Sequence, residues 1–147
     1  MPGLLAFIRS IGHSEIPTVE APRDPVPAPA ASTHLDGAAA VRRALSVVGR
    51  GKYRLGKGGR RPQDPAPFDR DGLLDCSGYM SWCLGLDRYQ PGRIGGDWIS
   101  TDSIVADATG PHRLFRALPL GAVAQPGDVV VYGGRRVGGV RVAIGHV

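Results

Sequence analysis

A helical pattern of apolar residues follows Asp36. Residues 37–48 carry one apolar stripe, which is made of Val41, Ala44, Leu45 and Val48. Aspartate is a favoured helix N-cap, and a glycine just past such a stripe favours the end of the helix. The sequence therefore predicts a helix over residues 37–48 that opens the folded domain.

A second helix is predicted over residues 76–86, with Asp75 as its N-cap. The residues expected to face inward are Tyr79, Met80, Cys83 and Leu84. This segment is more apolar than the first helix, although Gly85 weakens its end. We therefore expect it to lie at the centre of the domain.

Short apolar runs replace the helical pattern toward the C-terminus. A turn is predicted at residues 125–128, a buried strand at residues 129–132, and a second strand at residues 140–147 that pairs with it. Between the second helix and this hairpin the chain is irregular, apart from a short helix expected near residues 103–108. This order predicts an α+β fold in which the central helix packs on an antiparallel β-sheet.

The N-terminal part has a different composition. Residues 1–12 have apolar positions at the spacing of a short helical turn, and residues 17–34 are rich in proline and alanine, which is typical of a linker. The 147 residues include 22 Gly and 13 Pro, many of them in a loop over residues 49–72. We expect residues 1–35 to be a tail and linker that add little to the core, and residues 36–147 to form one domain.

Charge and hydropathy limit the class of partner. The formal net charge is +5, but the basic residues form short pairs such as Arg60-Arg61 and Arg135-Arg136 and not a continuous stripe. No recognition motif accompanies them, so nucleic acid is not an expected partner. No apolar stretch approaches the ~20 residues that cross a bilayer, and the N-terminus lacks a signal-peptide pattern. We therefore expect no membrane insertion, and a chain that is cytoplasmic or released by lysis or a dedicated secretion system.

Cys76 is the main candidate for chemistry, because it begins the second predicted helix. Free backbone N–H groups and the positive end of the helix dipole stabilise a thiolate there, and the same N–H groups can stabilise an oxyanion. Cys83 lies two turns away, beyond disulfide reach, and we expect it to be a buried free thiol. Two cysteines cannot form a four-ligand zinc site, and no cofactor or metal is expected. The alternative for Cys76 is that it too is a small buried hydrophobic residue.

A thiol nucleophile needs a base, and the chain has four histidines. His13 and His34 fall in the tail and linker, and His112 is most simply a solvated loop residue. His146 lies in a predicted strand of β-branched residues, where an imidazole is an unusual choice. His146 is therefore the candidate base, although a strand histidine taken alone is more often structural.

Several sequence blocks occur in one order along residues 36–147. They are Tyr53-Arg54-Leu55-Gly56 with Gly58-Gly59, then Asp75-Cys76-Ser77-Gly78, then Pro126-Gly127-Asp128 with the run to Tyr132, and Gly145-His146-Val147. In this order the chain resembles the NlpC-type cell-wall cysteine peptidases of the papain-like superfamily. The cysteine- and histidine-dependent amidohydrolases use the same pair in the same order.

The resemblance implies a cysteine hydrolase that cleaves peptide or amide bonds in bacterial peptidoglycan. Cys76 would attack a carbonyl of a stem peptide, and His146 would take up and return the proton. Tyr53, Asp75 and Ser77 would lie beside the substrate. The expected partner is therefore a peptidoglycan stem peptide or another peptide substrate.

Two departures from the family's pattern change these expectations. The stretch between Tyr53 and Cys76 is longer than is usual for the family, so substrate preference can differ. The chain also ends one residue after His146, before the strands on which the family orients its base and closes its sheet. An unpaired final strand predicts self-association through its edge. The missing orienting residue favours the alternative of a catalytically defective cell-wall-binding or interaction module.

Overall fold

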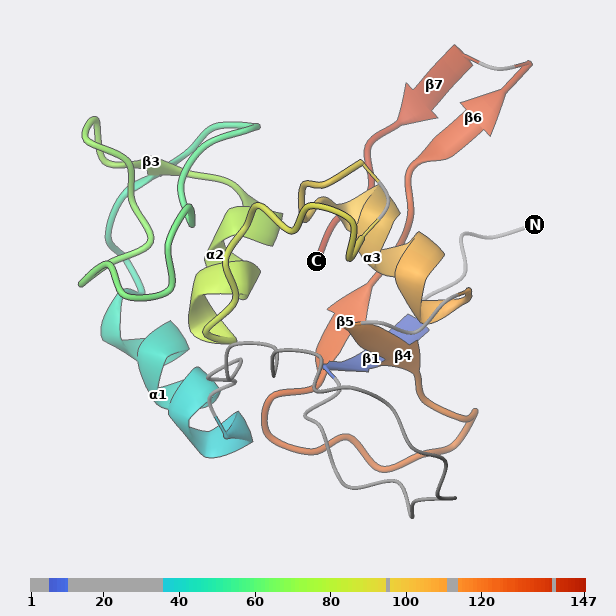
Figure 1. The fold of residues 1–147 in the computed structure, drawn as a ribbon, viewed down its shortest axis with the longest axis horizontal. Helices are drawn as coiled ribbons and strands as arrows, with labels where there is room; N and C mark the ends of the chain where they lie inside the picture. The colour runs from blue at the N-terminus through green and yellow to red at the C-terminus, as the bar shows by residue number, and fades with distance from the viewer. Residues whose placement is uncertain (1–5, 11–35, 95, 111–113, 139) are drawn as a thin grey trace, which may run out of the picture.

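The computed structural model describes residues 6–10, 36–94, 96–110, 114–138 and 140–147. Within these ranges, three helices and several short strands form a mixed α+β structure (Figure 1). The helices are α1 (Gly37–Ser46), α2 (Cys76–Cys83) and α3 (Thr101–Ala108). The α+β class predicted from the sequence is confirmed.

Each helix begins where a side chain caps its first turn. Asp36 and Asp75 each accept a hydrogen bond from a backbone N–H of the first turn, at 2.6 and 2.7 Å. Ser100 and Ser103 form a capping box at the start of α3. The two aspartate N-caps are therefore confirmed, although α1 and α2 are both shorter than predicted.

The buried face of α1 differs from the predicted stripe. Leu45 and Val48 are 67% and 68% exposed, whereas Ala40 and Val47 are buried. The first residue, Gly37, lies so close to Pro126 that a Cβ would collide with its backbone. This close approach at Gly37 and the packing of the small Ala40 in the core turn a different face of the helix inward from the one that the sequence predicts.

A three-stranded antiparallel sheet has its central strand near the N-terminus. β1 (Ala6–Ser10) pairs with β4 (Phe115–Ala117) on one side and with β5 (Val129–Val131) on the other (Figure 1). Ile8 is fully buried in the core of the domain. The prediction of a helical turn that adds little to the core is therefore wrong for residues 6–10, because a short apolar run fits a buried strand equally well. The predicted linker over residues 17–34 lies outside the described residues.

A short parallel pair of strands lies next to the start of α2. β2 (Lys52–Tyr53) pairs with β3 (Leu73–Leu74), and Tyr53 is in register with Leu74. Because β3 leads directly to the N-cap of α2, this pair places Tyr53 beside the beginning of that helix. The β2–β3 pair also holds together the two ends of the loop over residues 54–72.

The sequence predicts that His146 lies on an antiparallel sheet with residues 129–132, and this is right only for one antiparallel bridge, to Tyr132. β6 (Arg135–Val137) and β7 (Val140–Ala143) form a separate hairpin that projects from the rest of the molecule (Figure 1). His146 follows β7 and joins Tyr132 through an isolated bridge with two backbone hydrogen bonds of 3.0 Å. The glycines after Tyr132 interrupt the strand, so the residues beyond them pair locally with each other.

The buried apolar residues form two clusters, and α2 contributes to both. Met80 lies in the larger cluster with the buried residues of the three-stranded sheet and α3, and Trp82 lies in the smaller cluster with Val47. This agrees with the central position predicted for the second helix. None of the described helices has the length and apolar character needed to cross a membrane.

Replacing Ile8 with alanine tests the place of β1 in the core. We expect Ile8→Ala to lower the free energy of unfolding by about 2–5 kcal/mol, because a fully buried isoleucine leaves a cavity. Denaturant unfolding measures the change. Leu120→Ala is the control: Leu120 is fully exposed, and its replacement should change stability by less than about 0.5 kcal/mol. An equally small effect of both substitutions would contradict the position of β1.

Candidate active site

Cys76 is the first residue of α2 and borders a cavity of about 230 Å³. The cavity lies between the starts of α2 and α3 and is also lined by residues 55–56 and 144–145. In the described structure the backbone N–H groups of Cys76 and Ser77 have no hydrogen-bond partner, as is usual in a first helical turn. These donors are available to an oxyanion that forms beside the sulfur.

Tyr53 on β2 lies beside the thiol of Cys76, close enough for the two side chains to interact electrostatically. Although Tyr53 as a whole is 60% exposed, burial raises the pKa of its hydroxyl, and the neighbouring Cys76 and Asp75 raise this pKa further. The hydroxyl therefore stays protonated at neutral pH and can donate to the sulfur. The structure thus brings Tyr53 and Cys76 together.

Thr101, the first residue of α3, also faces the thiol. Its Oγ1 lies 4.0 Å from Cys76 Sγ, a long contact in which either group can donate. Its methyl group lies close to Gly145, where an added Cβ would come within 2.7 Å. Thr101 therefore fills the space between the cysteine and the segment that leads to His146. No local pattern marks it, since it lies 25 residues after the cysteine and reaches it only through the fold.

Asp75 is held by a buried ion pair with Arg88. Nη2 of Arg88 lies 2.6 Å from Oδ2 of Asp75, and both side chains are 2% exposed. Asp75 also accepts hydrogen bonds from the backbone N–H groups of Gly56 and Gly78, at 2.7 Å each, and from the Ser77 hydroxyl at 3.3 Å. Both carboxylate oxygens are thus occupied by protein donors, so Asp75 organises the start of α2. Direct contact of Asp75 and Ser77 with substrate stays a prediction.

Arg88 uses all five of its N–H donors inside the protein. Nη1 donates to the carbonyls of Lys57 and Gly58 at 2.8 and 2.9 Å, and Nε donates to the carbonyl of Ile99 at 3.4 Å. Nη2 donates to the start of α2, at Asp75 and at the Ser77 hydroxyl. The guanidinium therefore joins three chain segments around the cavity. The sequence offers no periodic or motif signal for this residue.

Gly59 and Gly78 allow two backbones to approach each other beside the cavity. A Cβ on Gly59 would collide with the backbone of Gly78, and a Cβ on Gly78 would lie 2.6 Å from Nη1 of Arg88. Glycine at both positions is therefore required by the packing of the protein on itself. The close approach keeps the loop before β3 against the start of α2.

His146 lies directly after a residue that lines the cavity. Its neighbour Gly145 lines the cavity, whereas His146 is exposed and its ring centroid lies 6.1 Å from that of Tyr132. Among the described contacts, no hydrogen bond joins the side chains of Cys76 and His146. The structure therefore places the predicted nucleophile and base in the same region without pairing them. His112, the alternative histidine, lies outside the described residues.

Cys83 is a buried free thiol in the smaller core cluster. Burial raises its pKa to about 11, against opposing effects of Tyr79 and Arg43. The thiol is therefore protonated at neutral pH and is a poor nucleophile there. Cys76 is also free, so the prediction of two unpaired cysteines is confirmed.

Comparisons with known proteins find no family model, curated protein or solved structure that matches this chain. In the part of the chain that the structure describes, no group of three or more His, Cys, Asp or Glu residues could hold a metal ion.

A double-mutant cycle tests the buried ion pair. Arg88→Met and Asp75→Asn should each lower the free energy of unfolding by about 3–5 kcal/mol, because each leaves a buried polar partner unpaired. The double variant should lose less than the sum of the two single changes, as denaturant unfolding can measure. Arg70→Met is the control, since its pair with Asp71 is exposed and should be worth less than about 1 kcal/mol. Equal effects of Arg88→Met and Arg70→Met would contradict the role given to Arg88.

The raised pKa of Cys83 predicts a loss of stability at alkaline pH. Between the ordinary value of 9.0 and the folded-state value of about 11, the unfolded thiol ionises while the folded thiol stays protonated. The unfolded state then binds fewer protons, so the free energy of unfolding falls as the pH rises. A shift of this size corresponds to a fall of about 2–3 kcal/mol. Cys83→Ala should show a smaller fall in urea unfolding across this pH range, and an unchanged fall would refute the assignment.

Proposed function

We propose that this protein is a cysteine-type hydrolase of peptide or amide bonds, with Cys76 as its nucleophile. The observation that carries the proposal is the position of Cys76 at the first turn of α2, on a cavity, with unused backbone donors and the Tyr53 side chain beside its sulfur. Cys83, the last residue of the same helix, packs in the smaller core cluster with Val47 and Trp82 and has no helix-start donors beside it. Cys76 instead begins the helix, where such donors are available to a substrate.

In the proposed reaction, the sulfur of Cys76 attacks the carbonyl carbon of the substrate amide. A C–S bond forms, and the carbonyl oxygen becomes an oxyanion that accepts hydrogen bonds from the backbone N–H groups of Cys76 and Ser77. The C–N bond then breaks, the amine leaves with the proton taken from the thiol, and a thioester remains. Water hydrolyses the thioester and restores the thiol. Tyr53 orients the sulfur through its hydroxyl.

We propose His146 as the group that carries the proton between thiol and amine. Its backbone is fixed by the bridge to Tyr132, while its neighbour Gly145 lines the cavity. The imidazole is exposed, so a change of rotamer can carry it from the Tyr132 ring toward the cavity when substrate binds. Hydrogen bonds of catalytic groups are often long or unformed in structures without substrate.

Peptidoglycan stem peptides are the proposed substrate class. This part of the proposal rests on the resemblance of the blocks around Tyr53, Cys76 and His146 to the NlpC-type peptidases. The polar groups at the sulfur fit an amide carbonyl, which every member of that substrate class offers.

One observation favours a second candidate, a non-catalytic module that binds the cell wall or another partner. His146 is exposed and has no described hydrogen bond to Cys76, which is the arrangement expected of a site without a working base. Such a module would bind peptidoglycan with equal affinity whether position 76 is cysteine or alanine, and would release no new amino groups from it.

Hydrolysis of purified peptidoglycan separates the two candidates. We expect the 147-residue chain to release new amino groups, and Cys76→Ala to abolish this release because the nucleophile is removed. His146→Ala should lower the rate by about 10²-fold or more, since it removes the general acid and base. Cys83→Ala is the matched control and should retain activity. Release that is equal in the chain and its Cys76→Ala variant, or absent from both, would refute the hydrolase.

A further inference from the structure

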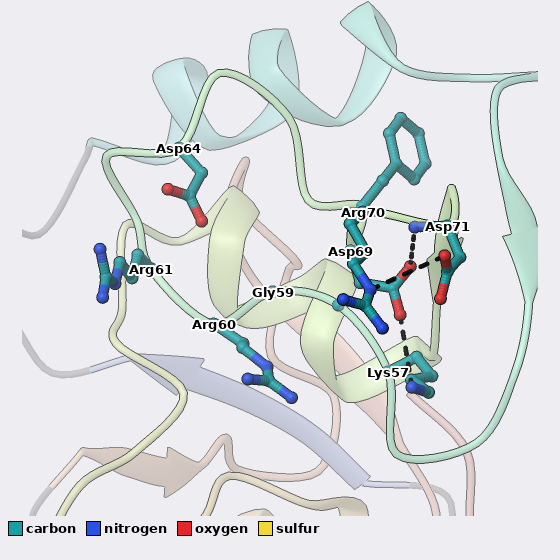
Figure 2. A pocket seen from close by; sticks show the side chains of 10 residues that line it. Lys57, Gly59, Arg60, Arg61, Asp64, Asp69, Arg70 and Asp71 are labelled. Carbon is teal, nitrogen blue, oxygen red and sulfur yellow. Dashed lines mark hydrogen bonds and ion pairs between the residues drawn. The ribbon is translucent and has the colours of Figure 1, made fainter.

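A larger cavity, of about 510 Å³, lies in the loop between β2 and β3 (Figure 2). Its lining comes from residues 57–61, from Asp64 and from residues 68–71. The carbonyls of Lys57 and Gly58, two residues of this lining, accept hydrogen bonds from Arg88, which itself lines the cavity at Cys76. One backbone segment therefore borders the larger cavity and supports the smaller one.

Charged side chains dominate the lining of the larger cavity. Figure 2 shows the charged ends of Lys57, Arg60 and Arg70 in one part of it, together with the carboxylates of Asp69 and Asp71. Lys57 pairs with Asp69 at 3.6 Å, and Arg70 pairs with Asp71 at 3.9 Å. No ion pair of Arg60 occurs within the described ranges. With Arg61 and Asp64, which also line the cavity, four cations face three carboxylates.

We propose that this cavity binds a carboxylate of an acidic peptide, with Arg60 as the principal contact and Lys57 as a second cation. A guanidinium offers two parallel donors that match a carboxylate. The excess of one positive charge suits a singly charged carboxylate, whereas a phosphate dianion would meet repulsion from Asp69 and Asp71. Phe68, which also lines the cavity, offers an apolar surface to the peptide chain.

This subsite deepens the proposed function, on which it rests, by defining the substrate as a peptide with a free carboxylate. Arg60 is tied to the cavity at Cys76, because its backbone carbonyl accepts a hydrogen bond from the N–H of Arg88 at 3.3 Å. A peptide that spans both cavities would have its carboxylate at Arg60 and its scissile bond near Cys76. In this proposal the loop between β2 and β3 binds acidic peptides through Arg60, and Cys76 at the start of α2 cleaves them.

Calorimetry with a pair of matched peptides tests the subsite. The protein is the full chain carrying Cys76→Ala, so that nothing is cleaved, and the probes are short blocked alanine peptides with one glutamate or one glutamine. We expect the glutamate peptide to bind about fivefold more tightly than the glutamine peptide, the size of an exposed ion pair. Arg60→Gln should remove this preference, and Arg60→Lys should keep part of it. Arg135→Gln, which removes an exposed arginine of β6, should leave it unchanged.

Three results would overturn the subsite. They are equal binding of the two peptides, an equal loss of preference in Arg60→Gln and Arg135→Gln, and displacement of the glutamate peptide by inorganic phosphate at the same concentration. The last would identify a general anion site instead of a peptide site. Because the binding is measured without turnover, a failure of the hydrolase to cleave peptidoglycan would leave the glutamate preference intact. Cleavage without that preference would refute the subsite alone.

Discussion

The buried ion pair between Arg88 and Asp75 is the interaction on which the candidate site depends. Asp75 caps the helix that begins with Cys76, and Arg88 binds Asp75 together with the carbonyls of the loop and of Ile99. A buried pair of this kind is stable only when its remaining donors and acceptors are satisfied, as they are here. The position of the sulfur therefore depends on a residue that takes no part in the proposed chemistry.

Those parts of the structure that depend on local chemistry could be predicted from the sequence. The capping aspartates, the start of α2 at Cys76 and the burial of Cys83 all depend on residues within a turn or two of each other. Long-range features could not be predicted in the same way. Ile8 belongs to the central strand only because β4 and β5, more than 100 residues later, supply its partners. Arg88 likewise acquires its role from segments that no spacing rule connects.

The two members of the proposed catalytic pair differ in how firmly the fold holds them. Cys76 is buried at the junction of α2 and its ion-paired cap, whereas His146 follows a projecting hairpin and is fixed mainly through its bridge to Tyr132. In the proposed reaction, substrate would supply part of the organisation at the histidine. Such a site would assemble around its ligand, and its activity would be more sensitive to substrate length than that of a preformed pair.

The parallel pair β2–β3 has a consequence for how this protein can change during evolution. It joins the two ends of the charged loop, and the entropy cost of closing a loop rises only slowly with loop length. Insertions and exchanges beyond the carbonyl of Arg60 can therefore accumulate without moving the start of α2. Substrate selectivity would then change through substitutions in the loop between β2 and β3. Reactivity would depend on the start of α2, where few substitutions are tolerated, so the two properties could evolve separately.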